Sequence, residues 1–227
     1  MKKDAIFEFF RRLAEENPSP ETELVFSNEY QLLVAVVLSA QMTDSGVNKA
    51  TGPLFAHVET PQQMLDLGED SLRDYIRTIN FHNTKAKNVI ALSQKLVSDF
   101  GGQVPRALDD LMSLPGAGRK TANVVRNCAF NEEVFPVDTH VFRVGNRTGL
   151  AKGKTPDDVE AKLDKRVPQP FRLHAHHWLI LHGRYVCKAR LPECWRCPVV
   201  DLCAYKSKVL EPPASRSVGK GKRALKS

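Results

Sequence analysis

Hydrophobic positions recur at helical spacing through most of the chain. Apolar residues return every three or four positions over long stretches, whereas the strict alternation typical of half-buried strands is scarce. Prolines and glycines interrupt these stretches and leave only short connections between them, as packed helices require. The pattern therefore predicts an all-α protein, with helices in the segments 5–16, 30–41, 85–100, 119–130 and 175–186.

The segment 30–40, YQLLVAVVLSA, is apolar around almost its whole helical circumference. A helix without a polar face is stable only when other elements surround it. We therefore expect a central helix that holds the following residues rigidly. Thr43 or Asp44 is then the candidate N-cap of the next helix, because short side chains with an oxygen accept the free amides of a first turn.

Composition places the chain among ordinary globular proteins. Of its 227 residues, 42% are hydrophobic and 26% are charged, which excludes a wholly disordered chain. No apolar run approaches the length of a membrane span, and acids and arginines break up the apolar residues of the segment 1–20, unlike a signal peptide. These features predict a cytoplasmic protein that does not enter a membrane.

The net charge of +7 is concentrated at the C-terminus. Residues 212–227 contain lysines and arginines but no acid, in a mixture rich in proline, serine and glycine that buries little apolar surface. This composition predicts a disordered basic tail. Two roles remain open for it, which are nonspecific contact with the phosphates of a polyanion and simple solubilisation.

Two helices joined by a tight turn are predicted for residues 107–130. The turn contains Gly116 and Gly118, and the second helix starts near Arg119. Glycines let another backbone come close, and the free amides at a helix start favour an anion together with the helix dipole. The turn is therefore a candidate phosphate-binding site, with a generic helix connection as the alternative.

Two charged residues, Lys120 and Asp138, lie at the starts of predicted helices. Lys120 lies in the first turn of the predicted helix, where the positive end of the dipole and the neighbouring Arg119 favour the neutral amine of a Schiff-base nucleophile. The alternative is that both residues bind phosphate. Asp138 precedes another helical pattern and is first of all a candidate N-cap, without a capping-box partner because Val141 occupies the third position after it.

A cysteine pattern, C-x6-C-x2-C-x5-C, is formed by Cys187, Cys194, Cys197 and Cys203. In a chain without a secretory signal, such a group indicates metal ligation, and four thiolates bind either zinc or an iron-sulfur cluster. Structural zinc sites usually have two close pairs of ligands, whereas only one close pair is present here. Cys128 lies in an apolar helical stretch and is expected to be a small buried hydrophobe.

Three of these elements resemble parts of one DNA-repair family. LPGAGRKTA resembles the helix-hairpin-helix motif, VDTHVFRVGNR resembles the segment with the catalytic aspartate, and the cysteine spacing matches the C-terminal 4Fe-4S site of the endonuclease III family. With TELVFSNEYQLLVAVVLSAQMTD and HHWLILHGRYVC, the resemblance extends over about residues 5–206. It implies a bacterial base-excision-repair DNA glycosylase with AP lyase activity.

The resemblance implies two helical lobes with DNA in the groove between them. A six-helix lobe with the helix-hairpin-helix is expected over residues 22–132, and an iron-sulfur cluster lobe over residues 1–21 and 133–211. The tail 212–227 lies outside the resemblance. The implied partner is duplex DNA that contains damaged pyrimidines or abasic sites, bound by a monomer.

The resemblance also assigns roles to individual residues. Lys120 attacks the sugar of an oxidised pyrimidine nucleotide, Asp138 stabilises the developing positive charge, and β-elimination cuts the strand 3′ to the abasic site. The four thiolates hold a 4Fe-4S cluster, which supports a DNA-contacting loop. The implied contacts to DNA come from Gln41, Phe81, Leu114, Gly116, Gly118, Arg119, Lys188 and Arg190, those to the base from Ser39 and Asp44, and those to a monovalent cation from Met112, Leu114 and Ala117.

One implied DNA contact departs from the family pattern. The second DNA-inserting loop has Phe81 where the family usually has leucine. Because an aromatic ring stacks on bases as well as wedging between them, we expect a shift in the preference for the opposite base.

Three other functions remain open. The first is a related glycosylase that removes adenine or uracil with the aspartate alone, against which it counts that the adenine enzymes usually lack a lysine at the position of Lys120 and carry an extra C-terminal recognition domain. A DNA-structure binder without catalysis is the second alternative, against which the presence of both Lys120 and Asp138 argues. A zinc-stapled module is the third.

Overall fold

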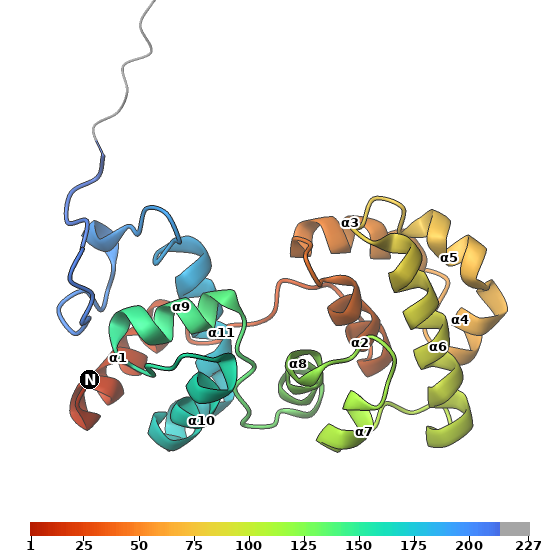
Figure 1. Cartoon of the computed structure of the whole chain (residues 1–227), viewed down its shortest axis with the longest axis horizontal. Helices are drawn as coiled ribbons and strands as arrows, with labels where there is room; N and C mark the ends of the chain where they lie inside the picture. The colour runs from red at the N-terminus through yellow and green to blue at the C-terminus, as the bar shows by residue number, and fades with distance from the viewer. Residues whose placement is uncertain (214–227) are drawn as a thin grey trace, which may run out of the picture.

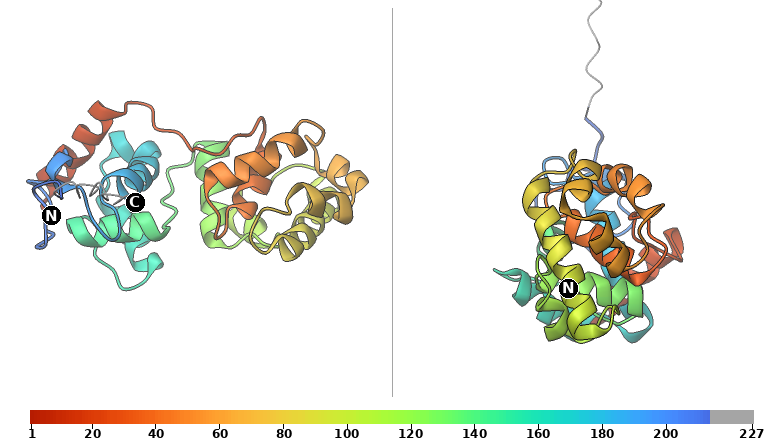
Figure 2. Two further views of the ribbon diagram at one scale, coloured as in Figure 1. Left: turned by 90° about the horizontal axis from the view of Figure 1, so that it is seen from above. Right: turned by 90° about the vertical axis from the view of Figure 1, so that its right-hand side faces the viewer.

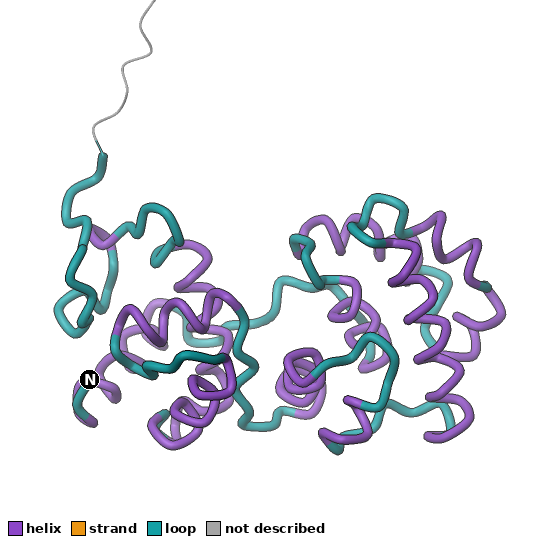
Figure 3. Tube along the Cα trace, viewed as in Figure 1, coloured by secondary structure: helices purple, strands orange, loops and turns teal. Residues whose placement is uncertain are grey.

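The structure, a computed structural model, describes residues 1–213. Its helices gather into two lobes that lie side by side along the longest axis of the molecule (Figure 1, Figure 2). Within the described range there are eleven α-helices, two 3₁₀ turns and no strand, so the all-α prediction is confirmed (Figure 3). The predicted basic tail, residues 212–227, lies almost wholly outside the described residues.

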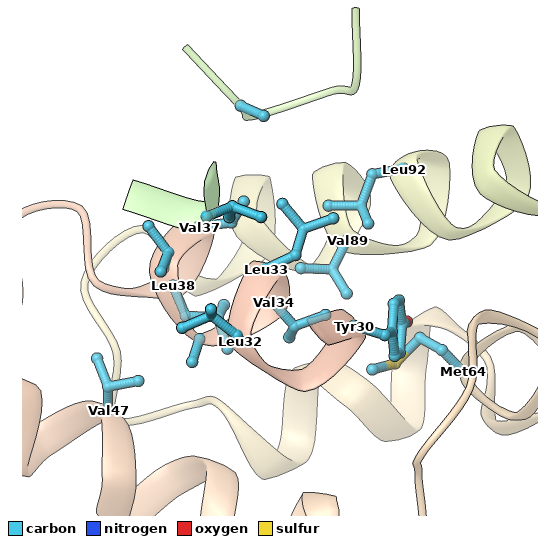
Figure 4. Packing of buried hydrophobic residues seen from close by; sticks show 14 of the residues in the cluster. Tyr30, Leu32, Leu33, Val34, Val37, Leu38, Val47, Met64, Val89 and Leu92 are labelled. Carbon is cyan, nitrogen blue, oxygen red and sulfur yellow. The ribbon is translucent and has the colours of Figure 1, made fainter. Parts of the chain in front are cut away.

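The first lobe is built around one buried helix. It consists of α2 (Glu29–Leu38), α3 (Asp44–Phe55), α4 (Pro61–Leu67), α5 (Glu69–Tyr75), α6 (His82–Phe100), α7 (Leu108–Met112) and α8 (Arg119–Phe130). Every residue of α2 from Tyr30 to Leu38 is buried, and Figure 4 shows side chains of this helix facing Val89 and Leu92 of α6. Helices α3 and α8 pack on other sides of α2, as its apolar circumference predicts.

Local signals set the helix boundaries of this lobe. Residues 22–132 contain seven helices where the resemblance implies six, because Gly68 has a φ of 80° and interrupts the path between α4 and α5. Of the two predicted caps of α3, Thr43 is the N-cap and accepts the amide of Gly46 at 3.2 Å.

The second lobe combines the N-terminal helix with the C-terminal part of the chain. It consists of α1 (Lys3–Glu16), α9 (Thr139–Thr148), α10 (Pro156–Arg166), α11 (Arg172–Tyr185) and the 3₁₀ turns η1 (Gln169–Phe171) and η2 (Cys194–Arg196). Phe9 and Phe10 of α1 have no exposed surface, and the ring of Phe10 contacts those of Phe171 and Trp178. Aromatic packing therefore attaches α1 to residues far away in the sequence.

Two extended segments connect the lobes. Residues 17–28 lead from α1 to α2, and residues 131–137 lead from α8 to α9 (Figure 1). The hydrophobic clusters on either side are separate, since one draws on residues 24–125 and the other on residues 6–13 and 135–199. None of the helices in the described range has the length and apolarity needed to span a membrane.

Leu33→Ala tests the central position of α2, because Leu33 has no exposed surface. We expect the free energy of unfolding to fall by roughly 3 kcal/mol, since the variant loses apolar burial and leaves a cavity. Denaturation by urea, followed by circular dichroism, measures this change. Val25→Ala is the control, because Val25 is 65% exposed. Equal losses in the two variants would contradict the assignment of α2 as the central helix.

Candidate active site

The two glycines of the hairpin between α7 and α8 have different surroundings. Gly116 has a φ of 82°, and a Cβ there would lie 3.1 Å from Asn88 and 3.2 Å from Val37, so this glycine lets the turn pack onto its own lobe. A Cβ on Gly118 would meet open space. Gly118 is the N-cap of α8, and no side chain caps the amides that follow it. These amides are therefore available to an anion.

Leu114 anchors the hairpin. Its side chain is 2% exposed, its N–H donates to the carbonyl of Leu111, and its own carbonyl accepts from Ala117. The implied contact of Leu114 with DNA therefore does not involve the side chain. Met112, another residue of the implied cation site, has a side chain on the surface.

Arg119 at the start of α8 is exposed but paired. Its guanidinium contacts both carboxylate oxygens of Glu160 on α10, at 3.0 and 3.3 Å. Asn123 donates to the same carboxylate at 3.1 Å. The implied DNA contact is thus part of an ion pair that joins the two lobes.

Lys120 and Asp138 border the same space between the lobes. Lys120 is exposed in the first turn of α8, and Asp138 is the half-buried N-cap of α9. Both line two adjoining cavities, the larger with a volume of about 690 Å³. Ser39 and Asp44 line both cavities as well. Four residues that the sequence analysis selected therefore lie at the ends of four different helices and line the same cavities. They are Ser39, Asp44, Lys120 and Asp138.

Asp138 uses one of its oxygens to cap α9. Oδ1 accepts the amide N–H of Val141 at 2.8 Å, so the predicted N-cap is confirmed. A carboxylate has two acceptor oxygens, so the cap orients the group and leaves Oδ2 for a proton or a positive charge.

Arg184 joins the lobes inside the site, and the sequence did not single it out. It lies in the last turn of α11 and lines both cavities. Its Nη1 donates to Asp44 at 2.7 Å and to Glu23, which also accepts from the hydroxyl of Tyr185. No local pattern indicates this ion pair, because 140 residues separate Arg184 from Asp44.

Beside its charged residues, the smaller cavity is lined by three titratable side chains whose pKa values are shifted by burial. They are Cys128, His176 and His177. Burial lowers the pKa of His176 well below its ordinary value, lowers the pKa of His177 to about 4 and raises the pKa of Cys128 to about 12. These three groups therefore add no charge to the cavity near neutral pH.

Gln41 and Phe81 lie on two loops that touch. Both have left-handed backbones, with φ angles of 56° and 59°. Gln41 lines the larger cavity, and Phe81 is 64% exposed. Asn80 donates to the backbone carbonyl of Gln41 at 2.8 Å and so connects the loops.

The four predicted cysteine ligands line one cavity. These are Cys187, Cys194, Cys197 and Cys203. All four are free thiols, and N–H donors reach two of the sulfurs, from Tyr205 to Cys203 at 3.4 Å and from Arg147 to Cys187 at 3.8 Å. Four thiols around one cavity, two of them with N–H donors, suit a group that takes four thiolates. Among residues 1–213, no set of three or more His, Cys, Asp or Glu side chains is placed to hold a metal ion.

The loop after Cys187 carries two implied DNA contacts to the surface. Lys188 and Arg190 are both exposed, although Lys188 forms an ion pair with Glu193. Arg147 donates to the carbonyls of Lys188 and Ala189 at 2.7 Å each. The loop is therefore held by its backbone, which leaves its side chains at the surface.

Comparisons with known proteins identify a family. The model of the HhH-GPD superfamily of base excision DNA repair proteins matches residues 34–169. The endonuclease III of Rickettsia conorii is 52% identical over 205 residues, which cover 90% of this chain and 98% of that protein. The endonuclease III of Escherichia coli is 52% identical over 209 residues, which cover 92% of this chain and 99% of that protein.

Solved structures give the same result. A trapped covalent intermediate of endonuclease III with DNA matches with a TM-score of 0.84 at 41% identity, over 90% of this chain and 96% of that chain. A thermostable thymine-DNA glycosylase, at 22% identity and a TM-score of 0.78, shares the fold. The chain therefore belongs to the HhH-GPD superfamily of base excision DNA repair proteins and, within it, to the endonuclease III family of DNA glycosylases with AP lyase activity.

Proposed function

We propose that this chain removes oxidised pyrimidines from duplex DNA through a Schiff base on Lys120, and then cuts the strand 3′ to the abasic site by β-elimination. The observation that carries the proposal is that Lys120 and Asp138 line the same two cavities from helix ends in different lobes. The solved covalent intermediate of a related endonuclease III with DNA supports it. The proposed folding units on either side of the groove are residues 22–132 and residues 1–21 with 133–211.

Lys120 supplies the nucleophile in this proposal. The damaged nucleotide leaves the base stack, which costs least for a lesion that already stacks poorly. The lone pair of the Lys120 amine then forms a bond to C1′ of the sugar. The bond between C1′ and the base breaks at the same time, and the base leaves with that electron pair.

Asp138 serves as the base for the attacking amine and stabilises the positive charge on the sugar in this proposal. Its Oδ2 accepts the proton that the attacking amine loses and faces the positive charge that develops on the sugar. Because Oδ1 accepts a hydrogen bond from the amide of Val141, the helix cap holds the carboxylate in one orientation. The cap and the catalytic role therefore use different oxygens.

Strand cleavage follows from the covalent link. The sugar opens when the bond between C1′ and the ring oxygen breaks. The oxygen keeps that electron pair and takes up a proton, while the lone pair of the Lys120 nitrogen forms an iminium with C1′. The iminium withdraws electrons and makes the C2′ proton acidic. When that proton leaves, its electron pair forms the C2′–C3′ double bond and expels the 3′ phosphate. Water then hydrolyses the imine and regenerates the free lysine.

The proposed contacts with DNA follow the surface of the groove. The free amides after Gly118 bind a phosphate of duplex DNA, and Arg119 exchanges its carboxylate partner for the same backbone. Gln41 fills the gap that the flipped nucleotide leaves, and Phe81 inserts beside it. The remaining contacts are assigned to Lys188 and Arg190 for phosphate and to Ser39 and Asp44 for the base.

The cysteine cavity is assigned to a 4Fe-4S cluster. Its thiolate ligands would be Cys187, Cys194, Cys197 and Cys203, which line that cavity together. A bound cluster supplies a rigid crosslink between these segments. Cys187 immediately precedes the loop of Lys188 and Arg190, so the four ligands hold a DNA-contacting loop and take no part in removing the base.

Lys120→Ala tests the Schiff base directly. On a duplex with one thymine glycol, we expect borohydride to trap a covalent adduct of the unchanged chain but none of the variant, because only an amine forms the reducible imine. Electrophoresis of labelled DNA measures the adduct. Lys49→Ala, which changes an exposed lysine of α3, is the matched control and keeps the adduct. Tight DNA binding by the unchanged chain without any adduct would instead favour a glycosylase that acts with aspartate alone or a silent binder.

Asp138→Asn accompanies this test on the same duplex. Asparagine is a good N-cap but carries no charge, so the melting temperature is expected to stay unchanged. The single-turnover rate of base removal is expected to fall by about 100-fold or more, the usual loss of a general base. A full rate in this variant would remove the aspartate from the mechanism.

Gly118→Ala and Gly116→Ala separate phosphate binding from folding. Gly118→Ala adds a methyl group in open space, so we expect weaker binding to duplex DNA at unchanged stability. Gly116→Ala forces alanine to a φ of 82° against Asn88 and Val37, and we expect it to lower the free energy of unfolding by about 1 to 3 kcal/mol. Fluorescence anisotropy and urea denaturation measure the two effects.

Gly52→Ala is the control for both hairpin variants. A Cβ at Gly52 of α3 meets nothing within 4 Å, and this residue is remote from the hairpin in the sequence. It is expected to leave DNA affinity unchanged. Unchanged DNA affinity in Gly118→Ala as well would contradict a phosphate contact at the start of α8.

Cys197→Ser tests the cluster without an activity assay. The purified chain is expected to be brown, with broad visible absorbance and bound iron and sulfide, because four thiolates hold a 4Fe-4S cluster. Cys197→Ser loses this absorbance, whereas Cys128→Ser, which changes the cysteine outside the cavity, retains it. A colourless protein that contains zinc would show that the four thiolates hold zinc instead.

A further inference from the structure

A buried lysine lies beneath the two loops that carry Gln41 and Phe81. Lys85, in the first turn of α6, is only 6% exposed. Its ammonium donates to the carbonyl of Leu38 at 2.9 Å and to the carbonyl of Ala40 at 2.6 Å. Both acceptors belong to the end of α2 and the turn that follows it, so this cation is directed at the backbone just before Gln41.

Burial of the Lys85 ammonium costs solvation free energy, which its two hydrogen bonds must offset. Burial lowers the pKa of its ammonium, because a charge loses solvation inside a protein. The cost is offset because the last carbonyls of a helix have no partner within the helix and form the negative end of its dipole. An apolar side chain of the same length packs there without solvation cost but leaves both carbonyls without this donor.

A third hydrogen bond joins the same two loops at the surface. The side-chain amide of Asn80 donates to the carbonyl of Gln41 at 2.8 Å. We refer to the three bonds from Lys85 and Asn80 to the carbonyls of Leu38, Ala40 and Gln41 as the loop clasp. Every acceptor in the clasp is a backbone carbonyl, so the clasp fixes the path of the chain whatever side chains it carries.

The two residues proposed to enter the DNA have strained backbones. Gln41 and Phe81 both have positive φ angles, at 56° and 59°, although neither is a glycine. Such conformations persist only where neighbouring contacts hold them. At Gln41 the clasp provides this contact, and Asn80, which donates to Gln41, immediately precedes Phe81. The carbonyl of Phe81 is held separately, by the first backbone bond of α6 from the amide of Lys85 at 3.0 Å.

We propose that Lys85 is a positioning residue for nucleotide extrusion, and that with Asn80 it presents Gln41 and Phe81 to the duplex as one preformed unit. The inference rests on the proposed function, in which these two side chains enter the DNA. Lys85 acts only through the backbone of the loops. A preformed pair of inserting side chains loses less conformational freedom when the gap opens than two separate loops would.

Lys85→Met and Lys87→Met form the matched test. Methionine keeps an unbranched apolar stem but donates no hydrogen bond, and Lys87 is an exposed lysine of the same helix. Single-turnover cleavage by the full chain is measured at an abasic site in a duplex and in the same strand without its complement, where no gap has to be filled. We expect Lys85→Met to lower the duplex rate about tenfold, in line with the loss of hydrogen bonds to a charged donor. The single-strand rate and both rates of Lys87→Met stay unchanged.

Extrusion itself is monitored by the fluorescence of a 2-aminopurine base placed opposite the abasic site. Its fluorescence rises when stacking is lost, and Lys85→Met is expected to slow or reduce that rise. Asn80→Ala removes the surface bond alone, and we expect a loss of about threefold in the duplex rate. This variant decides the question if Lys85→Met does not fold, because Asn80 is exposed and lies outside the hydrophobic core.

The possible results separate the two proposals. Equal losses on duplex and single strand, or no loss in either clasp variant, would overturn the role of Lys85. DNA binding by the unchanged chain without cleavage would overturn the proposed function. The 2-aminopurine signal on binding would then still decide whether the clasp positions the loops.

Discussion

Burial of α2 from Tyr30 to Leu38 is the constraint on which the rest of the structure depends. Because every residue from Tyr30 to Leu38 is buried, other helices must cover all sides of this helix. Val37 then lies close to Gly116 of the hairpin, and the carbonyl of Leu38 accepts the ammonium of Lys85. One apolar helix therefore positions both the turn proposed to bind phosphate and the loops proposed to enter the DNA.

The chemistry of the site is concentrated at helix ends. Ser39 follows α2, Asp44 begins α3, Lys120 lies in the first turn of α8, Asp138 caps α9, and Arg184 lies in the last turn of α11. Helix ends have a fixed direction but keep unsatisfied amides and carbonyls, so they hold a polar group rigidly while exposing it. Asp138 combines the two requirements, since Oδ1 caps the helix and Oδ2 takes no part in the cap.

Ion pairs across the groove supplement the two extended connections between the lobes. Arg184 of the second lobe contacts Asp44 of the first, and Arg119 of the first contacts Glu160 of the second. In the proposed complex with DNA, Arg119 leaves Glu160 for a phosphate. The contact between the lobes and the proposed phosphate contact therefore share the side chain of Arg119.

Although it did not predict the helices α4, α5 and α10, the sequence by itself determined the long apolar helices, the cap at Asp138, the choice between Thr43 and Asp44 as the cap of α3, and the residue types that meet in the site. These features depend on local periodicity and on the free amides of a first turn, both of which a short segment contains. Only the tertiary structure decided that Gly116 faces its own lobe while Gly118 faces open space, that Leu114 is buried, and that Arg184 forms an ion pair with Asp44. It also revealed Lys85, which a sequence pattern alone would place among surface lysines. The physical reason is that burial and pairing depend on contacts between residues far apart in the chain, which periodicity along one segment does not encode.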